Sequence, residues 1–242
     1  MSILECDIGN TRCKWRVYDA GKIIERGSFA LTQGFETFDL NFVVDRIRVA
    51  SVKERQALGG LISFCDERDI EPEFAESCPE AGGVINAYSE PAKLGVDRWL
   101  AAVAGFNRAQ GAVLVIDAGT ALKADLVAAN GQHLGGYIAP GLGLMESSLL
   151  SGTDKVRFAA GEYSGGVAFG CATIEAVNAG ILAAQLGTVK VAITEAKRRI
   201  PEGFAILLTG GDSEPIFQAL QGECDIEVVP DLVLDGLQWV LP

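Results

Sequence analysis

The chain has 242 residues, of which 49% are apolar, and 20 basic against 32 acidic side chains give it a formal net charge of −12. This length suits one large domain or two small ones, and the apolar fraction is sufficient for a buried core. The negative charge repels phosphate backbones and so disfavours a general nucleic-acid-binding protein. There is no run of roughly eighteen apolar residues and no secretory signal at residues 1–7, so we expect no membrane partner and a cytoplasmic location.

The cysteines and the single histidine exclude further classes of site. The six cysteines form no C-x-x-C pair, and we expect them to be small buried side chains rather than a zinc or redox site. His133 lies in a segment, residues 130–133, that is typical of a hairpin turn. Without a second histidine or a G-x-S-x-G motif, Ser-His-Asp hydrolysis is disfavoured. Acid–base chemistry must therefore depend on carboxylates, lysines or tyrosines.

The first half of the chain predicts strands, then helices. Apolar residues cluster or alternate over residues 3–6, 13–18 and 23–29, which indicates three strands. A further strand region is expected over residues 42–44 and 47–50. Residues 54–68 predict a helix and residues 82–91 an irregular segment. From Val96 to Phe106 apolar residues recur at helical spacing, so we expect a helix that ends by Gly111 and carries Asp97 in its first turn.

The second half repeats this order of elements. Residues 113–116 and 122–128 indicate strands, and a turn at Asn130-Gly131 leads into a third strand at residues 135–138. Thr173 is a candidate N-cap for the helix that follows it. An apolar strand is expected at residues 205–208, and Thr209-Gly210-Gly211-Asp212 follows it. We therefore predict an α/β protein of two similar lobes, with domains at residues 1–111 and 112–242.

Two strand ends carry the same polar pattern. Asp7-Ile8-Gly9-Asn10-Thr11 follows the first strand, and Asp117-Ala118-Gly119-Thr120-Ala121 follows the strand at residues 113–116. Glycine permits a tight turn that backbone amides can present to a phosphate, and an aspartate at the strand end can hold Mg²⁺. Either segment alone could equally be an ordinary hairpin. The occurrence of two copies, one in each half, favours phosphate binding.

Two other segments could contribute chemistry. Asp97 at a helix start is most often a stabilising first-turn acid, but Arg98 beside it could hold an anionic substrate while Asp97 accepts a proton. The pair Gly210-Gly211 could present backbone to a nucleotide, although such turns are common. The chain has neither a Walker lysine motif nor G-x-G-x-x-G, so P-loop and Rossmann phosphate sites are disfavoured.

Six motifs in one order, from residue 7 to residue 212, resemble the type III pantothenate kinases and cover almost the whole chain. They are Asp7-Ile8-Gly9-Asn10-Thr11, Asn86-Ala87-Tyr88, Leu94-Gly95-Val96-Asp97-Arg98-Trp99, Asp117-Ala118-Gly119-Thr120-Ala121, Gly136-Tyr137-Ile138-Ala139-Pro140-Gly141 and Thr209-Gly210-Gly211-Asp212. The resemblance implies two duplicated actin-like (RNase H-like) domains with a nucleotide cleft between them. It also implies a homodimer with the pantothenate site at the interface.

The activity that the resemblance implies is the ATP-dependent phosphorylation of pantothenate to 4′-phosphopantothenate, the first step of coenzyme A biosynthesis. Asp97 is then the catalytic residue that accepts the proton of the pantothenate hydroxyl. The residues implied to bind pantothenate are Tyr88, Gly95, Val96, Asp97 and Arg98, with Thr173 from the partner subunit. Those implied to bind ATP are Asp7, Ile8, Gly9, Asn10, Thr11, Lys14, Thr120, Gly210 and Gly211. The implied metal-binding residues are Asp7, for the Mg²⁺ that accompanies ATP, and Asp117, for a monovalent cation, K⁺ or NH₄⁺.

One position departs from the family pattern. The family usually has a second threonine where this chain has Lys123, on the strand after the second aspartate. Strand alternation puts Lys123 on the same side as Ala121 and Asp125, from which it could face the cleft, and its ammonium could partly replace the cation. The alternative is that Lys123 extends to solvent. Two other functions remain open: a non-catalytic accessory or regulatory relative, and an actin-like kinase for another small substrate.

Overall fold

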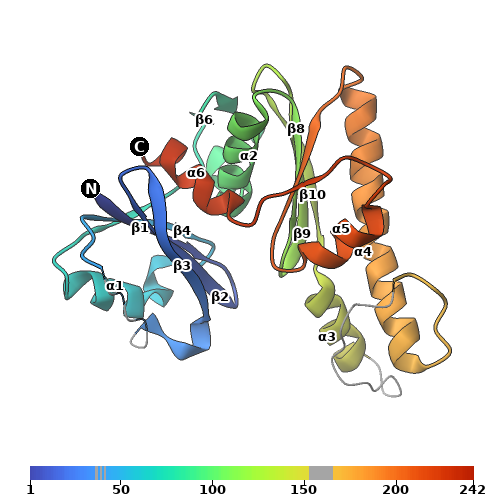
Figure 1. Cartoon of the computed structure of the whole chain (residues 1–242), viewed down its shortest axis with the longest axis horizontal. Coiled ribbons are helices and arrows are strands. Elements are labelled where there is room, and N and C mark those ends of the chain that lie inside the picture. Colours follow the sequence, from blue (N-terminus) through green and yellow to red (C-terminus); the bar gives the residue numbers. More distant parts are fainter. Residues whose placement is uncertain (36–37, 39, 41, 153–165) are drawn as a thin grey trace. The chain divides into compact units, whose positions relative to one another are not determined.

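A computed structural model describes residues 1–35, 38, 40, 42–152 and 166–242. The chain forms two compact units, each described by itself below. Unit 1 comprises Met1–Ala104 together with Leu232–Pro242, and unit 2 comprises Gly105–Asp231 (Figure 1). The domain limits expected from the sequence, 1–111 and 112–242, stay a prediction. The units differ from those halves because the C-terminal residues pack with the first half of the chain.

Unit 1 is built on a five-stranded sheet in the order β3-β2-β1-β4-β5. Its strands are β1 (Ser2–Ile8), β2 (Arg12–Asp19), β3 (Lys22–Ala30), β4 (Arg46–Ser51) and β5 (Pro72–Phe74). β1 pairs antiparallel with β2 and parallel with β4. Leu4, Cys6 and Ile8 alternate along β1 on one face, where they join a buried core with α1 (Gly59–Asp66).

The opposite face of this sheet is covered by helices. α6 (Leu232–Val240) packs against β1 and β4. α2 (Val96–Ala109) meets α6 at Gly236, where an added Cβ would overlap the backbone of Leu100. A small hairpin of β6 (Glu80–Ala81) and β7 (Val84–Ile85) and a 3₁₀ turn at Pro91–Lys93 connect the sheet to α2.

Unit 2 repeats the architecture of unit 1. Its sheet order is β10-β9-β8-β11-β12, from β8 (Val113–Ala118), β9 (Ala121–Val127), β10 (His133–Pro140), β11 (Ala205–Thr209) and β12 (Glu227–Val228). β8 pairs antiparallel with β9 and parallel with β11, as β1 does with β2 and β4. Asp7 and Asp117 therefore lie near the ends of equivalent strands. The internal repeat expected from the sequence is confirmed.

Helices α3 (Leu142–Gly152), α4 (Thr173–Arg199) and α5 (Ser213–Leu220) complete unit 2. Leu182, Leu186 and Val189 of α4 join Leu114 and Ile116 of β8 in its core. α4 is the one helix among the described residues that is long and apolar enough to cross a membrane, with a mean hydropathy of 1.4 over its most apolar stretch. The core helix of a globular protein can meet the same criteria of length and hydropathy, and the inner face of α4 is buried in the core of unit 2.

Four sequence expectations need correction. Residues 42–44 lie outside the strands, and Val43 is 89% exposed, so β4 begins only at Arg46. The helix expected over 54–68 is a 3₁₀ turn followed by the shorter α1. Cys171 is exposed and Cys78 and Cys224 are only partly buried, whereas Cys6, Cys13 and Cys65 are buried as expected. His133 is not in the turn itself but is buried as the first residue of β10, 2.9 Å from Asp125.

Candidate active site

The first phosphate-binding candidate is the tight turn between β1 and β2. The amide of Gly9 donates to the carbonyl of Arg12 at 3.0 Å, which closes the turn and leaves Asn10 and Thr11 exposed at its tip. Ile8 is buried and anchors the end of β1. Asp7 and Lys14 are paired positions on β1 and β2, so their side chains share one face of the sheet. The turn can offer backbone amides, a carboxylate and an ammonium to a phosphate group.

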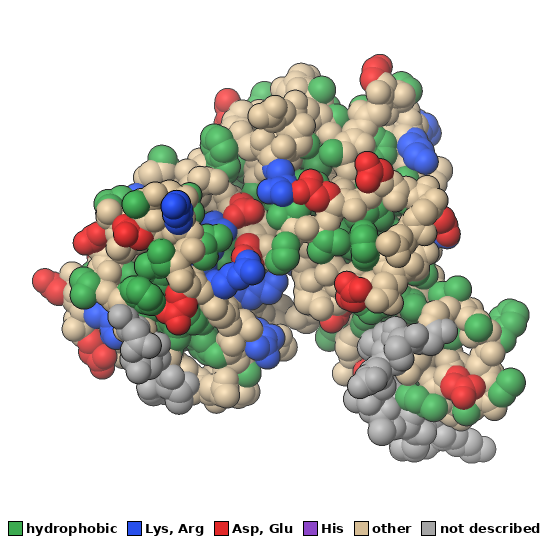
Figure 2. Space-filling model, viewed as in Figure 1, with side chains coloured by type: hydrophobic (Ala, Val, Ile, Leu, Met, Phe, Trp, Pro, Cys, Tyr) green, Lys and Arg blue, Asp and Glu red, His purple; other side chains and the backbone are tan. Residues whose placement is uncertain are grey.

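Two basic side chains lie beside this turn in a protein that is otherwise strongly acidic. Arg12 is the first residue of β2, and Lys14 lies two residues farther along the same strand. Figure 2 shows Lys and Arg side chains gathered over this part of the first sheet. Arg12 is held by a hydrogen bond of 2.8 Å from its guanidinium to the hydroxyl of Ser28. Local positive charge of this kind favours an anionic ligand such as a nucleotide phosphate.

The second cluster in unit 1 lies at the N-terminus of α2. Oδ1 of Asp97 accepts the backbone N–H of Arg98 at 2.8 Å, which fixes the carboxylate in the first turn. The guanidinium of Arg98 donates to the hydroxyl of Tyr88 at 2.9 Å, and Arg98 is only 5% exposed. Gly95 permits this arrangement, because an added Cβ would lie 2.8 Å from Oδ1 of Asp97. Of the residues expected to bind pantothenate, the structure thus brings together Tyr88, Gly95, Val96, Asp97 and Arg98.

In unit 2 the carboxylate of Asp117 already has a cationic partner. Nζ of Lys123 lies 2.6 Å from Oδ2 of Asp117, across the antiparallel pair β8 and β9. The side chains are 16% and 14% exposed, respectively. The alternative that Lys123 extends to solvent is therefore wrong.

The glycine pair after β11 lies against the same strand end. Gly210 has a φ of +99°, and an added Cβ would overlap the backbone of Ala118. The amide of Asp212 donates to the carbonyl of Ala118 at 2.9 Å. Burial, and then the nearby carboxylate of Asp117, raise the pKa of Asp212. Only glycine fits at position 210, which explains the motif in physical terms.

Thr120 and Thr173 occupy different places in unit 2. Thr120 lies in the turn after β8, and its carbonyl accepts the amide of Gly141 at 3.0 Å. Thr173 is exposed as the first residue of α4, so the expectation that it caps the helix is wrong. The N-cap is Ala172, and Glu175 accepts the free amides of Cys171 and Ala172 through its carboxylate. The hydroxyl of Thr173 is therefore not needed to cap the helix.

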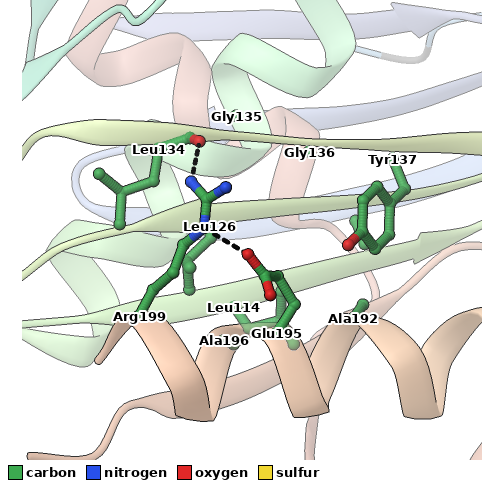
Figure 3. Close-up of a pocket in the computed structure, with 11 residues that line it drawn as sticks. Leu114, Leu126, Leu134, Gly135, Gly136, Tyr137, Ala192, Glu195, Ala196 and Arg199 are labelled. Carbon is green, nitrogen blue, oxygen red and sulfur yellow. Dashed lines mark hydrogen bonds and ion pairs between the residues drawn. The ribbon is translucent and has the colours of Figure 1, made fainter. Parts of the chain in front are cut away.

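A pocket of about 290 Å³ lies elsewhere in unit 2, between α4 and the sheet. Arg199 spans it, bound to the carbonyl of Leu134 and to Glu195 (Figure 3). Hydrogen bonds from Arg198 and Arg199 lower the pKa of Glu195 to about 2. Leu114 lines this pocket, and strand alternation puts Asp117 on the other face of the sheet. The pocket is therefore separate from the phosphate-binding candidate at the end of β8.

Comparison with known proteins decides the family. The family model described as type III pantothenate kinase matches residues 3–195. A type III pantothenate kinase of Ectopseudomonas mendocina (strain ymp) is 39% identical, and one of Pseudomonas putida (strain W619) is 36% identical; each alignment covers 99% of both chains. The chain belongs to this family.

Solved structures agree with the fold. A Baf family protein of Campylobacter jejuni, described as a transcriptional activator, has a TM-score of 0.61 at 20% identity and covers 97% of this chain and 95% of its own. The activator of the 2-hydroxyisocaproyl-CoA dehydratase of Clostridium difficile has a TM-score of 0.51 at 14% identity, with 98% and 92% covered. At these identities the likeness shows the fold alone. The expected actin-like fold of duplicated α/β domains is confirmed.

The donor sets of the two strand ends differ in what they can hold. Asp7 supplies carboxylate oxygen, the donor that Mg²⁺ prefers, beside turn amides that suit phosphate. Asp117 is compensated by an ammonium at 2.6 Å, so it fits a second cation less well.

The sequence analysis included Asn86 and Asp212 within motifs but assigned neither a role, because their contacts depend on loops that meet only in the folded protein.

Proposed function

We propose that Asp97 accepts the proton of the primary hydroxyl of pantothenate during its phosphorylation, with Arg98 and Tyr88 holding the substrate. As a type III pantothenate kinase, the protein catalyses the ATP-dependent phosphorylation of pantothenate to 4′-phosphopantothenate, the first step of coenzyme A biosynthesis. The observation that carries the assignment of roles is the cluster at the start of α2. There a carboxylate fixed by a backbone amide adjoins a buried guanidinium.

Phosphoryl transfer needs positioning and charge neutralisation more than covalent chemistry. The turn at Gly9, through the amides of Asn10 and Thr11, and the ammonium of Lys14 would receive the phosphates of ATP. Asp7 would hold Mg²⁺, which supplies neutralisation of phosphate charge when bound. Arg98 would pair with the carboxylate of pantothenate, which orients its hydroxyl toward Asp97. Thr120, Gly210 and Gly211 are the other residues proposed to contact the nucleotide.

Substitution of Asp97 by asparagine tests the assignment. The amide keeps the size of the carboxylate but cannot take a proton, and a positioned general base contributes ~10²–10⁴ in rate. We expect kcat to fall by at least about a hundredfold, while ATP still binds. Steady-state kinetics and ATP titration calorimetry measure the two effects. A variant with more than about a tenth of the wild-type kcat would show that Asp97 is not the base.

We further propose that the ammonium of Lys123 takes the place of a monovalent cation at Asp117. The ion pair of 2.6 Å between two largely buried side chains supports this, because the charge of Asp117 is already compensated there. An ammonium is a compact point charge comparable with K⁺ in its demand for oxygen ligands. The chain would then need no added K⁺ or NH₄⁺ for activity.

Activity in sodium buffer, with and without K⁺, tests this role in the wild type and in Lys123→Thr. We expect the wild type to be indifferent to K⁺ and the variant to depend on it. Thermal unfolding gives a second readout, in which K⁺ should raise the Tm of Lys123→Thr and leave that of the wild type unchanged. Full dependence of the wild type on K⁺ would contradict the proposal.

The active form is proposed to be a cytoplasmic homodimer. Unit 2 exposes large apolar side chains, among them Ile138 (64%), Leu144 (47%) and Val191 (59%) on β10, α3 and α4. Exposed apolar surface of this kind commonly marks an interface. A second copy of the chain that covers it would place Thr173, exposed at the start of α4, against the partner's pantothenate site.

A further inference from the structure

Asn86 lies at the centre of the loop that carries Tyr88. Its side-chain Nδ2 donates to the carbonyl of Cys78 at 3.2 Å and to the carbonyl of Pro91 at 3.4 Å. Its Oδ1 accepts the backbone N–H of Tyr88 at 2.9 Å. The backbone amide of Asn86 also donates to the carbonyl of Pro79 at 2.9 Å. One half-buried side chain thus joins the start, middle and end of the segment between β5 and α2.

The residue type is specific to this set of contacts. A primary amide offers two N–H donors and one carbonyl acceptor, and all three groups are used here in a single orientation. Aspartate could keep the acceptor for the amide of Tyr88 but would lose both donors. Alanine would lose all three bonds and leave the carbonyls of Cys78 and Pro91 to water.

The contacts of Asn86 continue to the candidate substrate site. The amide that Asn86 holds belongs to Tyr88, whose hydroxyl accepts a hydrogen bond from the buried guanidinium of Arg98. The guanidinium carbon of Arg98 also lies 5.8 Å from the centre of the Tyr88 ring. A shift of the loop at residue 88 therefore moves the partner that orients Arg98. Displacements of about 1 Å at a binding group are sufficient to weaken a substrate complex.

We infer that Asn86 is a positioning residue for pantothenate: it fixes the Tyr88 loop and, through it, the guanidinium of Arg98 that receives the substrate carboxylate. This inference rests on the proposed roles of Tyr88 and Arg98. It assigns to Asn86 no contact with the substrate. Its effect falls on the affinity for pantothenate and not on ATP, because the loop belongs to the cluster at the start of α2.

Kinetics of Asn86→Ala, Tyr88→Phe and the double variant test the inference. We expect Asn86→Ala to raise the KM for pantothenate about tenfold, with the KM for ATP within about twofold of the wild type. In the Tyr88→Phe background, where the hydroxyl is already absent, Asn86→Ala should raise the KM by less than about threefold. A merely structural role would give the same ratio in both backgrounds, and that result would overturn the inference.

Two further variants complete the design. Asn86→Asp, which retains the acceptor for Tyr88, should have a KM between those of the wild type and Asn86→Ala, and this comparison remains available if the alanine variant fails to fold. Asn130→Ala removes a matched bond, from the Gln132 amide to Oδ1 at 3.1 Å, in the hairpin of unit 2. It should leave the KM for pantothenate unchanged. A lower Tm for Asn86→Ala with an unchanged KM for pantothenate would overturn the inference. A failure of the pantothenate kinase function would be distinguishable, because the wild type would then not turn over pantothenate.

Discussion

At the end of β8, the carboxylate of Asp117 has an ammonium partner and a second carboxylate, that of Asp212, in its neighbourhood. Lys123 pairs with Asp117, and Asp212 lies close enough for the charge of Asp117 to affect it. Burial and that neighbouring charge raise the pKa of Asp212 above its ordinary value of 3.8. Ionisation of Asp212 therefore destabilises the folded state, since the folded protein binds the carboxyl proton more tightly than the unfolded chain does.

This linkage predicts a stabilising substitution. The contribution of Asp212 to the stability of the wild type should fall as the pH rises from about 3.8 through the raised pKa of Asp212, and Asp212→Asn should remove that loss. We expect the variant to have a higher Tm than the wild type at pH 7 and the same Tm at a pH below 3.8. Thermal unfolding at both pH values is the measurement, with the exposed Asp225→Asn as the control in the same unit. A Tm at pH 7 that does not rise would contradict the prediction.

Individual residues show which features of the structure could be predicted from the sequence. Glycine and aspartate at two strand ends predicted both turns, because the chemistry of a tight turn is local. Alternation predicted the face on which Lys123 lies, but the ion pair itself depends on the register of β8 and β9. The role of Asn86 was beyond prediction, since its partners Cys78 and Pro91 are set by how the loop closes.

Among the elements, α6 connects the two parts of unit 1 that carry site residues. It packs on β1, which carries Asp7 next to its last residue, and Gly236 packs against Leu100 of α2, which carries Asp97 in its first turn. A buried network supports the same contact: Arg16 bonds to Glu5 at 2.6 Å and to Asp235 of α6 at 2.6 Å. The sequence did not predict this helix, because a nine-residue segment has too few turns for its periodicity to be decisive.

Gly236→Ala tests the contact between α6 and α2. Alanine is the better helix former by ~1 kcal/mol, but its Cβ would overlap the backbone of Leu100, and overpacking costs about 1–3 kcal/mol. We expect a net loss of stability of ~1 kcal/mol or more in urea titrations. Gly59→Ala in α1, where an added Cβ meets nothing within 4 Å, should be neutral or slightly stabilising. Equal effects of the two substitutions would show that α6 does not pack tightly on α2.

For the whole molecule, the proposed homodimer requires each pantothenate site to combine Asp97 of one subunit with Thr173 of the other. Asp97→Asn and Thr173→Arg should each be inactive alone, because one removes the base and the other puts a bulky charge at the start of α4. In a mixed dimer, the unmodified Asp97 and the unmodified Thr173 meet in one site. Random exchange should therefore restore about a quarter of the wild-type activity.

The control mixes Asp97→Asn with Arg98→Leu, two changes on the same side of the site. Every site in that mixture contains one defect, so activity should stay at the level of the separate variants. Subunit exchange is followed by capture of an untagged variant on a tagged one. If exchange is complete and the first mixture is as inactive as the control, the site is not shared between subunits. Recovery in the first mixture alone would instead show that Asp97 and Thr173 act across the interface, since only a dimer can separate the two defects in this way.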